Sequence, residues 1–331
     1  MQRPATVASP VMSTLNGVLL DLATIVQGVL VLSAMDRVCG LWQRHPYTEP
    51  AETRERLRDA QIAVTNKVVL DRQILSGASE LRLVCIAATG TNNVDLEAAR
   101  ELGITVANVA RYATPAVVQH VFALILALTT RLPEYQRAVS SGAWQRHDRF
   151  CLMDYPIREL AGRTLGIVGF GELGQAVARV AEAFGLQVLI AQRPDGPPRE
   201  GRLPLEALLP QVDLLTLHCP LTDATRGLIG ARELGLMRRD ALLINTARGG
   251  IVDEQALAEA LRRGTLGGAG IDVLSTEPPR GGNPLLAPDI PNLIVTPHIA
   301  WASREARQRV VEEIAANIEA FLAGKDRNRV A

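Results

Sequence analysis

Short apolar runs rich in β-branched residues alternate with helical patterns along almost the whole chain. Strands are predicted at residues 18–20, 62–65, 83–87, 104–107, 165–168, 187–191, 212–217, 241–245, 269–273 and 293–295. Helices are predicted directly after Gly174 and at residues 94–102, 115–132, 205–209, 254–263 and 303–322. This alternation predicts an α/β protein whose parallel sheets are covered by helices on both faces and joined by right-handed crossovers.

The strand predicted at 165–168 runs directly into the sequence GFGELG. Gly169 permits a tight turn, Gly171 lets the backbone approach a pyrophosphate, and Gly174 lets the helix pack closely on the strand. The helix that follows presents free N–H groups and its positive dipole end to phosphates, and Glu172 and Leu173 are expected among the cofactor contacts. An ordinary glycine turn is the alternative, but strand, turn and helix together predict a dinucleotide-binding βαβ unit.

The length of 331 residues favours two lobes, because a chain of this size exceeds what one core usually supports. We expect the dinucleotide-binding domain at residues 111–296 and a smaller lobe at residues 1–110 plus 297–331. Residues 1–13 are expected to form an unstructured extension. The chain then crosses between the lobes twice, and a small-molecule substrate is expected in the cleft between them.

Charge and cysteine content exclude several classes of protein. Lys plus Arg and Asp plus Glu number 35 each, so no net positive field attracts nucleic acid. Cys39, Cys85, Cys151 and Cys219 are scattered without a C-x-x-C pair, which argues against a disulfide framework and favours a reducing cytoplasm. The histidines likewise lack metal-ligand spacing, so no metal site is expected.

Two apolar stretches are candidates for membrane segments. Residues 17–35 are interrupted by Asp21 and lack a basic flank or a cleavage site, so a strand, a loop and the approach to a helix are favoured. Residues 117–128 are too short to span a bilayer and contain Gln119 and His120, which favours a buried helix. No membrane association is expected.

Five segments together resemble the D-isomer-specific 2-hydroxyacid dehydrogenases. They are GFGELG with its helix, ATGTNNVD at residues 88–95, INTARGGIVDEQALAEAL at 244–261, GIDVLSTEPP at 270–279 and TPHIAW at 296–301. The resemblance implies a Rossmann-type dinucleotide-binding domain inserted in a smaller flavodoxin-like substrate domain. Within the family, AATGTNN, FCLMDYPIRELAG and AQRP are most similar to the glycerate dehydrogenase and hydroxypyruvate reductase branch.

The resemblance assigns roles that the reduction of a 2-keto acid also requires. Arg248 would hold the carboxylate and carbonyl oxygens with its planar fork of donors. His298 would be the general acid, and Glu277 would orient its imidazole and favour the charged form. Thr89 and Gly90 would offer backbone N–H groups to the carboxylate. The alternative for Arg248 is a surface ion pair, for His298 a core histidine, and for Glu277 an acidic helix or loop residue.

The cofactor contacts show one departure from the NAD-binding pattern. An acidic residue usually binds the ribose 2′-OH after the second strand, but here Gln192 occupies that position and Arg193 follows it. A guanidinium can pair with a 2′-phosphate that a carboxylate would repel, with Arg199 and Arg202 nearby, so NADP(H) is favoured and NAD(H) stays possible. The further cofactor contacts are expected at Cys219, Pro220, Thr246, Ala247, Arg248, Asp272 (near the nicotinamide) and His298.

These residues predict an NAD(P)-dependent oxidoreductase that reduces a small 2-keto acid, above all hydroxypyruvate or glyoxylate, with oxidation of D-glycerate or glycolate as the reverse reaction. Two alternatives stay open. One is a nicotinamide-sensing, non-enzymatic co-regulator of the same fold, and the other is a dehydrogenase of another small anion such as phosphite or formate.

The helix predicted at residues 115–132 has almost no polar face. An all-round apolar helix needs cover on every side. The family resemblance places this helix at a twofold interface between cofactor domains, so we expect a homodimer.

Overall fold

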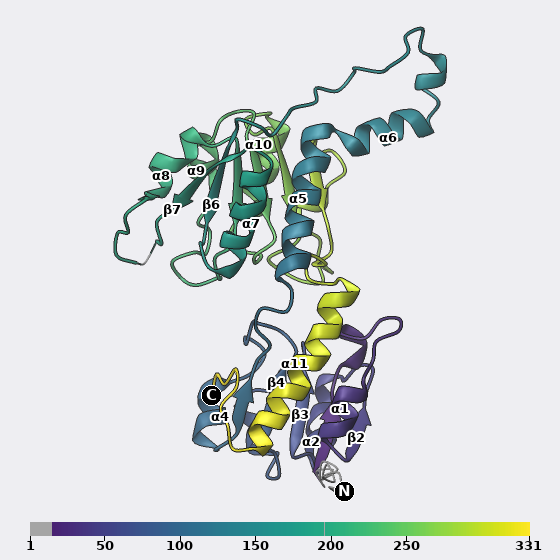
Figure 1. Cartoon of the computed structure of the whole chain (residues 1–331), viewed down its shortest axis with the longest axis vertical. Helices are drawn as coiled ribbons and strands as arrows, with labels where there is room; N and C mark the ends of the chain where they lie inside the picture. Colours follow the sequence, from purple (N-terminus) through teal and green to yellow (C-terminus); the bar gives the residue numbers. More distant parts are fainter. Residues whose placement is uncertain (1–14, 195) are drawn as a thin grey trace, which may run out of the picture. The chain divides into compact units, whose positions relative to one another are not determined.

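The computed structural model describes residues 15–194 and 196–331. The chain folds into two compact units, of which the first runs to Ala113 and resumes at Ser303, and the second spans Thr114–Ala302 (Figure 1). Residues 111–113 thus belong to the first unit and residues 297–302 to the second, so both boundaries lie later than expected. The second boundary lies later because Asp272 bonds the backbone of residues 299 and 300. The extension expected at residues 1–13 lies outside the described residues.

The first unit contains a five-stranded parallel sheet in the order β2-β1-β3-β4-β5, which is the flavodoxin-like order. All four residues of β3 and of β4 are buried, as expected for central strands covered on both faces. The strands are β1 (Asn16–Leu19), β2 (Leu41–Arg44), β3 (Ile62–Thr65), β4 (Leu83–Ile86) and β5 (Thr105–Ala107). The helices are α1 (Ser33–Val38), α2 (Thr53–Leu57), α3 (Arg72–Ser76), α4 (Leu96–Glu101) and α11 (Arg304–Leu322), with 3₁₀ turns η1 (Leu22–Thr24) and η2 (Pro50–Glu52).

The second unit contains a seven-stranded parallel sheet in the order β12-β11-β10-β9-β6-β7-β8. The strand order reverses between β6 and β9, which is where doubly wound sheets bind their ligands. The strands are β6 (Thr164–Val168), β7 (Gln187–Ala191), β8 (Arg202–Leu203), β9 (Leu214–Leu217), β10 (Leu242–Asn245), β11 (Gly268–Ile271) and β12 (Leu293–Val295). The helices are α5 (Thr114–Thr130), α6 (Leu132–Ser140), α7 (Glu172–Ala183), α8 (Leu205–Leu208), α9 (Ala231–Leu236) and α10 (Glu254–Arg262), with 3₁₀ turns η3 (Trp144–Arg146), η4 (Leu209–Gln211) and η5 (Pro284–Leu286). The two parallel α/β sheets confirm the predicted fold class.

The helix expected at residues 115–132 is broken at Arg131, whose backbone is left-handed with φ +56°. The apolar side chains of α5 pack within this single chain against α7, β10 and β11, so their burial does not require a second subunit. The buried positions include Val117, Val118, Val121, Phe122, Leu124, Ile125 and Leu128.

The exposed apolar surface of this region lies instead on α6 and the segment 141–157, which extends away from the sheet of the second unit (Figure 1). Its exposed large side chains are Leu132, Val139, Trp144, Phe150, Met153, Tyr155 and Ile157. Within the described part of the chain, no single helix has the length and apolar character needed to cross a membrane. Only α5 and α6 taken together, with a bend of 61° between them, meet that criterion.

Candidate active site

The glycine turn after β6 contains two glycines that the packing of the protein requires. Gly169 has φ +93°, and a Cβ there would lie 2.5 Å from the carbonyl carbon of His218. A Cβ on Gly174 would overlap the carbonyl oxygen of Gly169. A Cβ on Gly171, in contrast, would meet no atom within 4 Å. Internal packing therefore does not require a glycine at position 171, and the open space there leaves room for a ligand to approach the backbone.

Helix α7 begins at Glu172, with Gly171 as its N-cap and no side-chain capping bond. Helices α3, α4, α10 and α11 each begin with an Asp or Ser side chain that accepts a backbone N–H group. The Glu172 carboxylate is bonded to the Thr114 hydroxyl at 2.6 Å. At the start of α7 no N-cap side chain accepts the first backbone N–H groups, so these groups and the helix dipole fit a pyrophosphate.

A cavity of about 220 Å³ lies beside the carboxyl end of β7. Its walls are mainly apolar, and its polar members Gln192 and Arg193 directly follow the strand. The lining residues are Val168, Ala191, Gln192, Arg193, Pro194, Pro204, Leu205 and Leu228. An apolar pocket with a few polar groups fits a planar base and its ribose.

The Gln192 amide is bonded to the loop that closes this region. Its Nε2 donates to the Arg199 carbonyl oxygen at 2.9 Å, and its Oε1 accepts the Arg199 N–H at 3.1 Å. Gln192 therefore orders the loop on which Arg199 lies, a structural task that the sequence pattern did not indicate.

Arg248 lies on the turn after β10, which Asn245 shapes. The Asn245 side chain accepts the N–H of Ala247 and donates to the carbonyl oxygen of Arg248, both at 3.0 Å. Arg248 itself is partly buried and donates from Nη1 to the Ala247 carbonyl oxygen at 2.7 Å. The Thr246 hydroxyl is buried and has no hydrogen-bond partner among the described residues, so a bound ligand can satisfy it.

His298 and Glu277 form a hydrogen-bonded pair, as expected for a general acid and its orienting carboxylate. The distance from His298 Nδ1 to Glu277 Oε2 is 2.6 Å, and the two side chains are 30% and 34% exposed. Glu277 Oε1 also accepts the N–H of Leu274 at 2.8 Å. The bond at Nδ1 leaves Nε2 as the ring nitrogen available to a substrate.

Asp272 is 1% exposed and bonds to the segment that contains His298. Its carboxylate accepts the N–H groups of Ile299 and Ala300 at 2.9 Å and the Thr296 hydroxyl at 2.5 Å. His120 Nε2 lies 3.0 Å from that hydroxyl. No motif indicates this contact of His120, because helix α5 and residue 296 are far apart along the chain.

His218 and Cys219 lie against the glycine turn but carry no charge at neutral pH. Burial lowers the pKa of His218 to about 4 and raises the pKa of the Cys219 thiol to about 11. The Pro220 carbonyl oxygen accepts the Thr225 hydroxyl at 2.6 Å. Neither of these two side chains therefore supplies a charge to a phosphate at the turn, where backbone N–H groups can bind it instead.

Thr89 and Gly90 lie in the first unit, on the loop after β4. The Thr89 hydroxyl donates to the Val109 carbonyl oxygen at 2.9 Å, and the Thr89 carbonyl oxygen accepts the Asn108 amide at 2.8 Å. These bonds fix the loop whose two backbone N–H groups are expected to bind the substrate.

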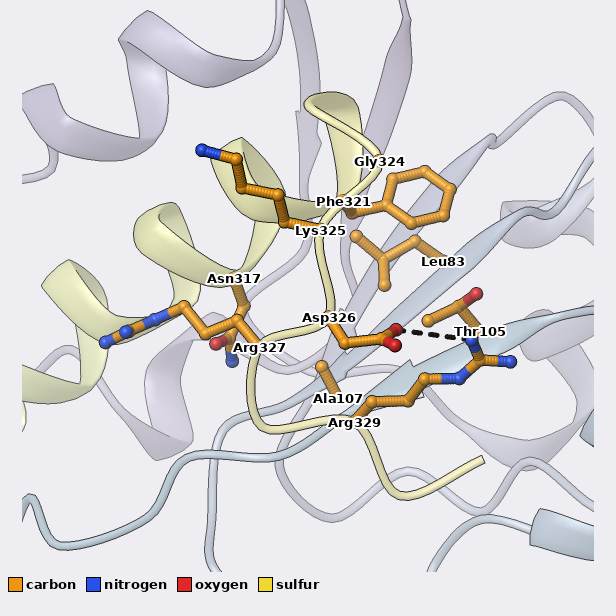
Figure 2. A pocket seen from close by; sticks show the side chains of 10 residues that line it. All are labelled: Leu83, Thr105, Ala107, Asn317, Phe321, Gly324, Lys325, Asp326, Arg327 and Arg329. Carbon is orange, nitrogen blue, oxygen red and sulfur yellow. Dashed lines mark hydrogen bonds and ion pairs between the residues drawn. The ribbon is translucent and has the colours of Figure 1, made fainter.

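A second pocket, of about 190 Å³, lies in the first unit between α11, β5 and the C-terminal segment (Figure 2). None of the expected site residues lines it. Asp326 and Arg329 form an ion pair at 3.3 Å there, and Arg327 pairs with Glu313 at 2.7 Å (Figure 2 shows the first pair). Internal pairing thus neutralises both arginines of this pocket. Among the described residues, no group of three or more His, Cys, Asp or Glu could hold a metal ion.

The glycine turn at the point where the strand order reverses, with a His–carboxylate pair in the same unit, is typical of a dinucleotide-dependent oxidoreductase. Sequence and structure comparisons specify the class further. The NAD-binding domain of the D-isomer specific 2-hydroxyacid dehydrogenases matches residues 122–300. The glycerate dehydrogenase of Methylorubrum extorquens is 49% identical over 292 residues, which cover 86% of this chain and 92% of that protein.

Two solved structures are similar over nearly their full length. A protein of Thermus thermophilus has a TM-score of 0.84 and 36% identity, with 96% of this chain and 100% of that chain covered. An NADPH-dependent glyoxylate/hydroxypyruvate reductase of Sinorhizobium meliloti, in complex with NADP and malonate, has a TM-score of 0.79 and 29% identity, with 96% and 97% covered.

The chain therefore belongs to the D-isomer specific 2-hydroxyacid dehydrogenase family, which confirms the resemblance drawn from its motifs. It is an NAD(P)-dependent oxidoreductase that transfers a hydride between a nicotinamide cofactor and a small 2-keto or 2-hydroxy acid.

Proposed function

We propose that this enzyme reduces hydroxypyruvate or glyoxylate, with D-glycerate or glycolate as the product, and that it prefers NADPH to NADH. The observation that carries the proposal is the hydrogen bond of 2.6 Å between His298 Nδ1 and Glu277 Oε2. The loop that contains Glu277 packs, through Leu274 and Ser275, against the turn after Arg248. The relative named glycerate dehydrogenase and the structure named glyoxylate/hydroxypyruvate reductase support this substrate class.

The proposed residues divide the reaction into separate tasks. Arg248 binds the substrate carboxylate and polarises the ketone. Thr89 and Gly90 are proposed as substrate contacts through their backbone N–H groups. When bound, the nicotinamide cofactor supplies the hydride. His298 donates the Nε2 proton to the forming alkoxide, and Glu277 accepts the Nδ1 proton in a hydrogen bond and stabilises the imidazolium.

The cofactor is proposed to be held along the carboxyl edge of the second sheet. Gly171 and the first N–H groups of α7, from Glu172 and Leu173, bind the pyrophosphate, and the cavity beside β7 takes the adenosine half. The buried Thr246 hydroxyl and the turns at 219–220 and 246–248 complete the nicotinamide side. Asp272 acts there through the loop that it bonds rather than through a free carboxylate.

The proposed preference for NADPH is supported by Arg193, which follows β7 and lines the cavity, because a guanidinium can pair with a 2′-phosphate. No carboxylate follows β7 directly, because Gln192 stands there and its amide is bonded to Arg199. NADPH use by the Sinorhizobium meliloti relative is consistent with this preference.

Steady-state kinetics with hydroxypyruvate, glyoxylate and pyruvate, each with NADH and NADPH, tests the proposal. A charge-assisted pair at the 2′-phosphate should lower the KM for NADPH by about ten- to a hundredfold relative to NADH. Arg193→Ala should remove most of this difference and leave NADH kinetics unchanged. A variant at Arg193 tests the 2′-phosphate contact more directly than a variant at Gln192. Replacing the Gln192 amide would also remove its two hydrogen bonds to the Arg199 backbone.

Arg263→Ala is the matched control, because that exposed arginine lies at the end of α10. Equal KM values for the two cofactors, unaffected by Arg193→Ala, would contradict the NADPH preference. Turnover of phosphite or formate, without turnover of any 2-keto acid, would identify that small anion as the substrate. Cofactor binding without turnover of any of these acids would favour a nicotinamide-sensing co-regulator.

Two further properties belong to the proposal. The four cysteines are free thiols, three of them buried, which supports a reducing cytoplasm as the place of action. The exposed apolar side chains of α6 and the segment 141–157 support assembly as a homodimer.

A further inference from the structure

The Glu254 carboxylate is bonded to both ends of the loop that contains Glu277. Its Oε1 accepts the Ser275 N–H at 2.6 Å, and its Oε2 accepts the Ser275 hydroxyl at 2.7 Å. The same Oε2 accepts the Asn283 side-chain amide at 2.7 Å. A single side chain therefore ties residues 275 and 283 to the start of α10.

Helix α10 does not need these bonds for its own N-terminus. Asp253 is the N-cap, and its side chain accepts the N–H of Ala256 at 3.0 Å. A carboxylate in the first turn of a helix interacts favourably with the helix dipole, and hydrogen bonds to a carboxylate are among the stronger ones in proteins. The Glu254 side chain is thus free to act on the neighbouring loop.

Other contacts around this loop locate the effect of Glu254 next to the reacting groups. A Cβ on Gly249 would overlap the backbone of Leu274 and Ser275, so the turn after Arg248 packs directly on these two residues. The Leu274 N–H is bonded to Glu277, which in turn is bonded to His298. The backbone at 274–275 is therefore held between the Arg248 turn and Glu254, two residues before Glu277.

We propose that Glu254 is a positioning residue for the Glu277–His298 pair. It fixes the 275–283 loop so that the Glu277 carboxylate stays within hydrogen-bond distance of His298 Nδ1. The inference rests on the proposed function in so far as the pair is the proton donor. Loss of the Glu254 carboxylate should lower kcat rather than cofactor affinity, because the glycine turn proposed to bind the pyrophosphate follows a different strand.

The test compares Glu254→Ala, Glu254→Gln and the control Glu259→Ala, which removes an exposed carboxylate from the same helix. For Glu254→Ala, kcat should fall by about ten- to a hundredfold, while the dissociation constant of NADPH stays near the wild-type value. Glu254→Gln should restore most of kcat, because its amide oxygen still accepts the Ser275 N–H. Unchanged kcat in Glu254→Ala would overturn the proposal.

A double-mutant cycle separates positioning from general destabilisation. If Glu254 acts through Glu277, then Glu254→Ala should cost little further activity in a Glu277→Gln background. Fully multiplicative losses would overturn the proposal. Should Glu254→Ala fail to fold, Asn283→Ala removes one of the three bonds and should give a smaller fall in kcat with the same dependence on Glu277.

A spectroscopic readout keeps this test separate from the substrate assignment. The His298–Glu277 hydrogen bond should give a low-field proton NMR signal that moves upfield in Glu277→Gln, because a neutral amide is a weaker acceptor than a carboxylate. Glu254→Ala should broaden or shift this signal, and Glu259→Ala should leave it in place. An unaltered signal in Glu254→Ala would overturn the positioning role, even if none of the tested 2-keto acids proves to be the substrate.

Discussion

His298 has a left-handed backbone, with φ +55°, which is unusual for a residue other than glycine. Such a conformation costs about 1–3 kcal/mol and persists only where the surroundings impose it. Asp272 imposes it here, because its backbone oxygen accepts the His298 N–H at 2.8 Å and its carboxylate holds Ile299 and Ala300. The strained backbone thus presents the imidazole to Glu277, and the strain coincides with the proposed proton donor.

Removal of the proposed proton donor should slow the chemical step. His298→Ala should lower kcat on the order of 10²- to 10⁴-fold, because the variant lacks the group that delivers a proton to the alkoxide. The dissociation constant of the cofactor, measured by fluorescence quenching, should change far less. Glu277→Gln should cost less than His298→Ala, since an amide can still accept the Nδ1 proton but cannot stabilise an imidazolium. Near-wild-type kcat in the histidine variant would assign the proton transfer to another residue.

The unit formed by β6, the glycine turn and α7 contains residues needed for packing and residues proposed to bind the cofactor. Gly166 belongs to this unit as well, since a Cβ there would lie 2.7 Å from a Leu208 methyl group. Gly169 and Gly174 satisfy packing within the element, whereas Gly171 faces open space. The same short sequence therefore contains glycines that packing requires and one, Gly171, whose proposed role is in cofactor binding.

This division predicts opposite phenotypes for two neighbouring glycine variants. Gly171→Ala should leave the melting temperature close to the wild-type value and weaken cofactor binding by about tenfold or more, because the new methyl group occupies the path of the pyrophosphate. Gly174→Ala should destabilise the fold, since its Cβ overlaps the Gly169 carbonyl. Thermal melts and cofactor titrations of both variants measure the two effects.

Gly235→Ala is the matched control, because Gly235 lies inside helix α9 and its Cβ would also meet nothing within 4 Å. It should raise stability by about 0.4–1 kcal/mol and leave cofactor affinity unchanged. If Gly171→Ala behaves like Gly235→Ala in both assays, the pyrophosphate does not approach the backbone at residue 171.

For the whole molecule, the distribution of exposed apolar surface decides where a second copy can bind. Helix α5 is already covered within one chain, whereas Phe150 is 91% and Met153 73% exposed on the segment after α6. Exposed apolar side chains gathered on one projecting segment are typical of an interaction surface. The proposed homodimer is therefore expected to form through α6 and residues 141–157.

Light scattering at micromolar concentration should give twice the chain mass of 35.7 kDa. Replacing Phe150 and Met153 by Asp should shift the protein towards the monomer, because each charge would have to be buried in the interface. Val29→Asp changes a residue that is 80% exposed in the first unit and should leave the dimer intact. A stable monomer for the unaltered chain would refute this assembly.

Hydrophobic periodicity along the chain predicts most of the buried strands, because a strand covered on both faces needs a continuous apolar run. The same signal misses β2, whose residues are mostly exposed, and the two-residue strand β8, which is too short to show a pattern. It also joins the start of α6 to the end of α5, since nothing in the local sequence marks Arg131 as left-handed. Exposed and very short elements are set by neighbours in space rather than by local sequence.

The residue types of the site can be read from the chain alone, since the glycine turn, Arg248, Glu277 and His298 lie in recognisable motifs. The side chains that support them emerge only in the folded protein, through the Asp272 bonds, the contact of His120 with Thr296, and the three bonds of Glu254. The physical reason is separation along the chain. Motifs encode short-range backbone geometry, whereas hydrogen bonds between distant segments exist only after the sheet has brought the carboxyl ends of its strands to one edge.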